Sequence, residues 1–132
     1  MFTFSTIKDY QNNLLHSKTT CLEAVQYYLE AIKAKSHLNA YLEVFEDDAI
    51  ATAKALDTKR QMGKPLGKLH GVVIALKDVI CYKGHQVSAA SKILQNFTSI
   101  YHATAVEKLL AEDAIIIGRN NCDEFAMGSS NE

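Results

Sequence analysis

Two short apolar runs, Val72–Leu76 and Ala114–Ile117, are the most regular pattern in the chain. Neither run alternates with polar residues. An unbroken apolar run of this length is typical of a strand covered on both faces, as in a parallel sheet with helices above and below. We therefore predict two buried strands. The first is followed directly by Lys77 and Asp78, and the second by Gly118.

A helix is predicted between these two strands. Thr104 and Glu107 have the spacing of a capping box, and the apolar residues behind them repeat with helical periodicity. Strand, helix and strand then form a βαβ unit, in which the strands are parallel and the crossover is right-handed. The carboxyl ends of both strands share one edge of the sheet, so Lys77 is expected on the same side as the polar run 119–123. If the strands are direct neighbours, they lie about 4.8 Å apart.

The first 62 residues are predicted to be mainly helical. Helices are expected over 5–16, over about 21–35 behind a capping box, and from 46–48 to about 60, where acids at the start and bases at the end suit the helix dipole. A short strand is expected over 40–45. The side chains expected to face a core are Ile7, Leu14, Leu15, Leu22, Val25, Leu29, Ile32, Ala49, Ala53 and Leu56.

A long connection, Ile80–Ala103, follows the first buried strand and shows little periodicity. A short helical turn is expected inside it near 90–94. Connections of this length are uncommon in a compact domain and often belong to functional sites. The whole pattern predicts a single α/β domain, with a helical region at 1–62 and a sheet region at 63–132.

Composition narrows the class of protein. A chain of 132 residues, 48% hydrophobic and 22% charged, is typical of one globular domain. A formal net charge of −1 gives no reason to expect a nucleic-acid-binding face. No apolar run approaches the ~20 residues that span a bilayer, so no membrane association is expected. The three cysteines form no CxxC pair, which argues against a disulfide framework or a zinc site and favours a reduced, cytoplasmic setting.

Lys77 is the first candidate for chemistry. At the end of a strand its ammonium can reach solvent or pair with Asp78, and both are ordinary structural roles. The alternative is a general base. Only the neutral amine can accept a proton, and burial in a water-excluded site would favour that form. The residues alone leave these alternatives open.

A second candidate region follows the last predicted strand. Asn120, Asn121, Asp123 and Glu124 suit either a ligand-binding cluster or the capped start of a helical turn. In the segment 125–132, FAMGSSNE, Gly128, Ser129 and Ser130 are expected to give a flexible loop rich in hydrogen-bond donors. Its serines lack a GxSxG motif or a His–Asp partner pattern, so they do not by themselves indicate a hydrolase. No nucleotide-binding glycine motif is present.

These motifs resemble the amidase signature family. The stretch GKLHGVVIALKD followed by ICYKGHQVSAASKIL carries the resemblance. Within the family, YHATAVEKLLAEDAIIIGRNNCDEFAMGSSNE is most similar to the A subunits of glutamyl-tRNA(Gln) amidotransferases. The likeness is dense over 63–132 and looser over 19–62, and DEFAMGSSNE is its most specific part. Cys122 stands where these subunits usually have methionine, and Val79 where asparagine is common.

The resemblance implies a large mixed sheet sandwiched by helices. This chain would supply the N-terminal helices and the first βαβ part of that sheet. It also implies a Ser–cis-Ser–Lys triad with Lys77 at the lysine position, where the lysine deprotonates the cis serine and this serine activates the nucleophilic serine. Met127, Gly128, Ser129 and Ser130 become candidates for lining the substrate pocket, and no metal ligand is expected.

The implied activity is hydrolysis of glutamine to release ammonia. The partners would be B and C subunits, with ATP and Mg²⁺ held by a partner, and the complex would convert Glu-tRNA(Gln) to Gln-tRNA(Gln). Both catalytic serines of the family would follow Glu132, so we expect the N-terminal part of a longer protein, inactive alone. Two alternatives remain: part of a general carboxamide hydrolase, or a non-catalytic α/β assembly domain that associates through an exposed sheet edge.

Overall fold

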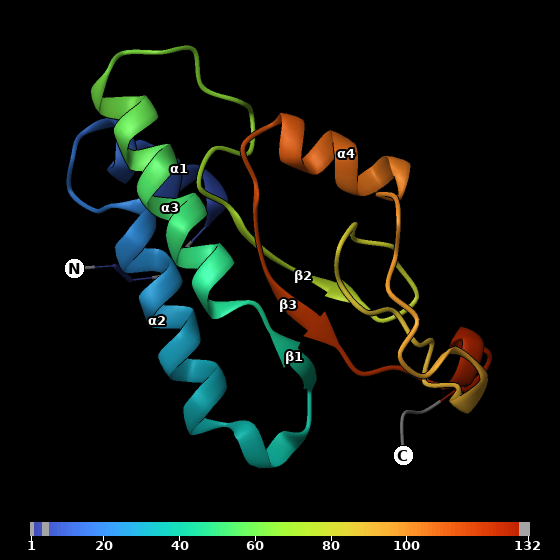
Figure 1. Cartoon of the computed structure of the whole chain (residues 1–132). Coiled ribbons are helices and arrows are strands. Elements are labelled where there is room, and N and C mark those ends of the chain that lie inside the picture. The colour runs from blue at the N-terminus through green and yellow to red at the C-terminus, as the bar shows by residue number, and fades with distance from the viewer. Residues whose placement is uncertain (1, 4–5, 130–132) are drawn as a thin grey trace.

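The computed structural model describes residues 2–3 and 6–129. Within these ranges four α-helices and a three-stranded sheet form three layers (Figure 1). The helices α1, α2 and α3 lie on one side of the sheet, and α4 lies on the other. The elements are α1 (Ile7–Leu15), α2 (Cys21–Ala34), β1 (Tyr41–Val44), α3 (Glu46–Gln61), β2 (Val73–Lys77), α4 (Thr104–Ala111) and β3 (Ile115–Asn120), with 3₁₀ turns at Ser36–Leu38, Lys92–Leu94 and Glu124–Ala126.

The sheet has the strand order β1-β3-β2. β2 and β3 are parallel neighbours joined through α4, which confirms the predicted βαβ unit. β1 pairs with the other side of β3 in the antiparallel direction, so the sheet is mixed. A strand from the predicted helical region 1–62 therefore shares one sheet with two strands from the region 63–132. β3 is the central strand, and β1 and β2 are its two neighbours.

The helix starts confirm one of the two predicted capping boxes. Thr20 and Glu23 form the expected capping box at α2, and the Thr6 side chain accepts a hydrogen bond from the Asp9 backbone at α1. The predicted capping box at Thr104 is wrong. Thr104 is already the first helical residue of α4, and Ala103 occupies the cap position without a side-chain hydrogen bond. The capping box is absent because α4 begins one residue earlier than the pattern predicted.

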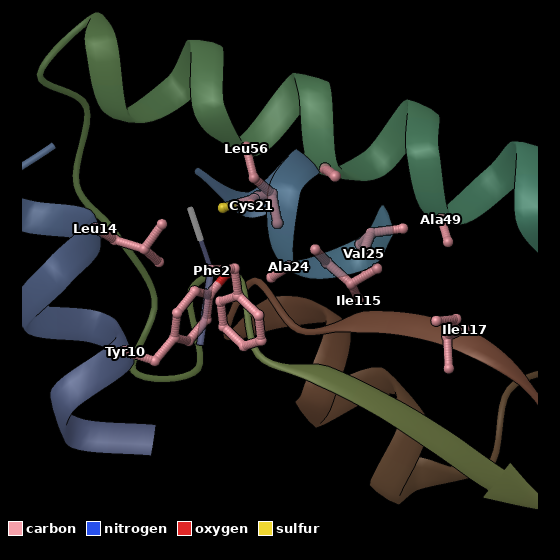
Figure 2. Packing of buried hydrophobic residues seen from close by; sticks show 11 residues of the cluster. Phe2, Tyr10, Leu14, Cys21, Ala24, Val25, Ala49, Leu56, Ile115 and Ile117 are labelled. Atoms are coloured by element: carbon pink, nitrogen blue, oxygen red, sulfur yellow. The ribbon is translucent and has the colours of Figure 1, made fainter. Parts of the chain in front are cut away.

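The larger core lies between α1–α3 and the sheet (Figure 2). The predictions of Ile7 and Leu15 as core residues are wrong, because both are exposed. Leu15 lies about 100° around the helix from the buried Leu14, so the two cannot face the same way. Tyr10 takes the inner face instead, with its hydroxyl bonded to the Gly71 carbonyl at 3.0 Å. The buried members are Phe2, Tyr10, Leu14, Cys21, Ala24, Val25, Ala49, Ala53, Leu56, Ile115 and Ile117.

A smaller core lies under α4, where Phe45, Leu76, Val106 and Ile116 are buried together. The prediction of two-sided burial is confirmed for β3 and wrong for the first three residues of β2, which are half-buried. The reason is position in the sheet. β3 is covered on both faces and flanked by two strands, whereas no described strand pairs with the outer edge of β2.

The connection 78–103 is held by local contacts. A bridge between Gln86 and Thr98 closes it, and the rings of Tyr82 and His85 stack with centroids 4.2 Å apart. Its 3₁₀ turn at Lys92–Leu94 confirms the helical turn expected near 90–94. None of the helices in the described ranges combines the length and apolar character that a membrane crossing requires.

Candidate active site at the carboxyl end of the parallel strands

Lys77 is the last residue of β2 and pairs in register with Asn120 on β3. This register confirms that Lys77 and the polar run after β3 share one edge of the sheet. The Lys77 side chain is exposed, and among the described residues its ammonium makes no hydrogen bond or ion pair. The expected burial of this amine is therefore not provided by the residues that the structure describes.

Asp78 does not pair with Lys77. Its side chain is fully buried and accepts hydrogen bonds from the Ser88 backbone (3.0 Å), the Ser88 hydroxyl (2.5 Å) and the Ala90 backbone (3.3 Å). The Arg119 guanidinium adds an ion pair at 2.6 Å. Burial raises the pKa of the Asp78 carboxyl, but the hydrogen bonds from Ser88, Arg119 and Ala90 outweigh burial and leave the pKa below its ordinary value. Asp78 is thus an ionised structural group.

Arg119 ties the three strands together at this edge. It comes from β3, binds Asp78 just beyond β2, and reaches Glu43 on β1 at 3.3 Å. The sequence pattern did not single out Arg119 or Ser88 for these roles. For Arg119 a signal was available, because Asp78 follows one strand and Arg119 lies near the carboxyl end of its parallel neighbour, so opposite charges meet at one edge of the sheet. The position of Ser88 within an irregular connection gave no such signal.

The backbone around Asp78 is fixed as firmly as its side chain. The Asp78 N–H donates to the Asn120 carbonyl at 3.0 Å, and the Asp78 carbonyl accepts from the Ala89 N–H at 2.9 Å. Ala89 and Ala90 both have left-handed φ angles, +51° and +52°. Such angles cost non-glycine residues on the order of 1–3 kcal/mol and persist where surrounding contacts enforce them. The turn is therefore shaped by its bonds to Asp78.

The segment after β3 folds back onto this turn, because the Phe125 N–H donates to the Ala89 carbonyl at 2.8 Å. Met127, Gly128 and Ser129 follow and are exposed. Ser130 lies outside the described residues. A methyl group added to Gly128 would come within 2.6 Å of the Asp123 side chain, so the chain passes close to it there. The role of these four residues in lining a substrate pocket stays a prediction.

Cys122 is a neighbour of the candidate site that the sequence showed only as a departure from the family pattern. Its thiol is buried. Burial raises the pKa of the Cys122 thiol, the charge of Asp78 raises it further, and the ammonium of Lys77 partly offsets both. Lys77 and this thiol are thus close enough to interact electrostatically.

Three hollows in the surface of the described residues do not include Lys77 in their lining. One of about 660 Å³ runs between α2 and β1 and includes Tyr28, Ile32 and Tyr41. Two smaller ones, of about 220 and 160 Å³, lie beside His70 and beside Ile7. In the described ranges no group of three or more histidine, cysteine or acidic side chains is arranged to hold a metal ion.

A second polar cluster includes Cys21, which belongs to the larger core. The Cys21 sulfur is 3.9 Å from His70 Nε2, and His70 Nδ1 is 3.1 Å from Asp113. The order thiol, imidazole, carboxylate is that of a nucleophile, a base and an orienting group. However, Cys21 is fully buried, and burial is the main cause that raises its thiol pKa to about 12. The cluster therefore acts as a buried structural network.

Comparison with known proteins identifies the class. The family model described as Amidase matches residues 23–132, which is most of the chain. The chain belongs to the amidase family. Its fold matches solved structures of that family, which confirms the predicted fold class. In the native peptide amidase from Stenotrophomonas maltophilia the match has a TM-score of 0.85 at 30% identity, over 95% of this chain and 26% of that one.

The curated relatives narrow the likeness within the family. The chain is 46% identical over 129 residues to the A subunit of glutamyl-tRNA(Gln) amidotransferase from Chlorobium phaeobacteroides. The identity is also 46% over 129 residues to the A subunit of the same enzyme from Chlorobaculum parvum. Each alignment covers 98% of this chain and 27% of the relative. The chain thus spans about a quarter of the length of these relatives and is homologous to their N-terminal region.

Proposed function

We propose that this chain is the lysine-bearing N-terminal portion of a glutamine-hydrolysing A subunit of glutamyl-tRNA(Gln) amidotransferase. The observation that carries the proposal is the 46% identity to such proteins over 98% of the chain. The identity is higher than the 30% found with the peptide amidase structure. The complete complex would form Gln-tRNA(Gln) from Glu-tRNA(Gln).

In this proposal Lys77 is the general base. Its neutral amine takes the proton of a cis serine hydroxyl, that serine takes the proton of a second serine, and the second oxygen attacks the glutamine carboxamide. The amide C–N bond breaks, ammonia leaves with a proton returned through the same relay, and water then hydrolyses the acyl-serine to glutamate. Two features of this chain support the role. Lys77 lies at the open carboxyl edge of the parallel strands, and the neighbouring carboxylate, Asp78, is bound to Arg119 instead.

The same proposal assigns the partners. Ammonia would pass to a B subunit that holds ATP and Mg²⁺ and binds Glu-tRNA(Gln), with a C subunit completing the complex in the cytoplasm. The net charge of −1 supports tRNA binding outside this chain, because contacts to phosphates require a basic surface.

A segment exchange with a curated relative tests the proposed function. This chain replaces the homologous 129 residues of the Chlorobium phaeobacteroides relative, and the hybrid is assembled with the B and C subunits of that organism. We expect glutaminase activity and tRNA-dependent amidation, both reduced at least about 10³-fold by Lys77→Ala because the base is lost. Lys83→Ala, at an exposed lysine of the neighbouring connection, is the matched control and should leave both activities intact. Equal activity of the two variants would refute the role of Lys77.

A general carboxamide hydrolase is the second candidate, and the 30% identity to the peptide amidase over 95% of the chain supports it. The same segment exchange into that peptide amidase separates the two candidates. A hybrid that works in the peptide amidase and fails in the amidotransferase would favour the hydrolase. A chain that serves only as an assembly domain would support neither reaction.

A further inference from the structure

We propose that Asn120 is a positioning residue whose side-chain oxygen accepts a hydrogen bond from the Lys77 amine and orients it toward the reacting groups. The inference rests on the proposed role of Lys77 as a base. It deepens that role by naming the group that holds the amine in place. The two residues are direct partners in the register of β2 and β3.

Both side chains leave the sheet on the same face. Along β2, Val73 and Ala75 pack against the core under α1–α3, whereas Leu76 packs against the core under α4. Because side chains alternate along a strand, Lys77 follows Ala75 to the first face. Direct partners on neighbouring strands project to the same face, so Asn120 lies beside Lys77 there. Asp78 takes the opposite face with Leu76.

The Asn120 carboxamide oxygen is a buried acceptor without a hydrogen-bond partner among the described residues. Leaving such an atom unpaired is costly, and buried acceptors are normally satisfied. The amine of Lys77 is the complementary group, a donor without a partner in the described part of the chain. The four-carbon side chain of Lys77 is flexible, so its amine can reach the side chain of Asn120, the direct partner of Lys77 on the neighbouring strand.

An uncharged amide oxygen is a suitable hydrogen-bond acceptor for an amine that acts as a general base. A carboxylate beside Lys77 would favour the ammonium, which cannot accept a proton, whereas an uncharged oxygen orients the amine without that penalty. The surrounding charges are arranged accordingly, since Asp78 is neutralised by Arg119. The other titratable groups near this edge are Cys122 and Asp123 after β3 and Glu43 on β1, which also contacts Arg119.

The test measures the neutral amine of Lys77 in the 132-residue chain itself. The chain is treated with trace acetic anhydride at a series of alkaline pH values. Peptide mass spectrometry then gives the rate of Lys77 acylation at each pH. In Asn120→Asp we expect the rate below the Lys77 pKa to fall about fivefold, the factor that a unit charge at about 4 Å produces in water. The profile should move up by about 0.7 pH unit. Asn13→Asp, the same change at a half-buried position of α1, is the control and should match the wild-type profile.

A second measurement needs no variant. In the wild-type chain, a nuclear Overhauser contact between the Lys77 ε-methylene and the Asn120 side-chain amide is expected. Absence of that contact, or equal profiles for the two aspartate variants, would overturn the proposal. These readouts report the contact alone, so they remain informative if Lys77→Ala leaves the hybrid enzyme active and the proposed function fails.

Discussion

Replacing Arg119 with methionine removes the guanidinium that neutralises the fully buried Asp78 carboxylate at 2.6 Å. Methionine keeps most of the side-chain volume and removes the charge and the hydrogen bonds. The remaining partners of Asp78, chiefly Ser88, offer hydrogen bonds and no positive charge. The variant thus tests how much of the fold depends on one ion pair at the carboxyl edge of the sheet.

The expected loss is about 3–5 kcal/mol in the free energy of unfolding, because removing one partner leaves a buried charge uncompensated. Arg119 also contacts Glu43, whose side chain is 43% exposed. That second pair is largely screened by solvent and contributes about 0–1 kcal/mol. Glu43→Gln is therefore the control, since it breaks the exposed pair and leaves the buried one intact.

Urea unfolding followed by circular dichroism measures both variants. With a slope of about 2 kcal/mol per molar urea, Arg119→Met should lower the midpoint by about 2 M and Glu43→Gln by less than about 0.5 M. Equal shifts of the two midpoints would refute the assignment of the stabilisation to the Asp78 pair.

The pH dependence gives an independent check. Burial raises the pKa of Asp78, and hydrogen bonds from Ser88 and Arg119 lower it further than burial raises it, so the folded-state pKa lies below the unfolded one. The ionised carboxylate therefore stabilises the fold fully above the unfolded pKa, and this contribution is lost as the pH falls through the folded pKa. Without Arg119 the carboxyl protonates more readily, so the difference between Arg119→Met and wild type should shrink in acid.

Two further outcomes follow from packing and burial. Gly67→Ala should destabilise the chain by about 2 kcal/mol or more, because the new methyl would meet the Glu112 backbone at 2.3 Å. Gly63→Ala, where nothing lies within 4 Å, should cost about 1 kcal/mol, for its positive φ alone, and the same urea assay compares them. In native-state labelling with iodoacetamide, half-buried Cys81 should react while fully buried Cys21 stays protected, and equal labelling would contradict the buried-network assignment.

Sequence periodicity predicted the fold where local chemistry and burial agree. The apolar run of β3 and the capping box of α2 are examples, because each depends on residues that are close together in the sequence. Periodicity was wrong at Ile7 and Leu15, since which face of a short helix is buried depends on what it packs against. It also could not show that β2 borders β3 on one side only, because strand order is a property of the whole sheet.

The candidate site was likewise predictable from the sequence only in part. The placement of Lys77 at one edge of the sheet with the polar run 119–123 followed from topology, since parallel strands joined by one helix end at the same edge, whereas the direct pairing with Asn120 came from the structure. The partner of Asp78 did not follow from the pattern, although the opposite charge of Arg119 on the neighbouring strand was a usable sign. The burial of the Cys122 thiol, and the effect of the Lys77 charge on its pKa, required the fold of the segment after β3.

The exposure of Lys77 and the half-burial of β2 have one cause. Residues 73–75 are half-buried, and Lys77 is exposed at the end of the same strand, because no described strand pairs with its outer edge. A polypeptide segment that covered the outer edge of β2 would remove both the apolar side chains of residues 73–75 and the amine of Lys77 from water. Burial of the apolar surface would drive the association, at about 25 cal/mol per Å², while the loss of water would shift Lys77 toward the neutral form that a base requires. In the proposed function, completion of the sheet and activation of Lys77 as the base would therefore be a single event.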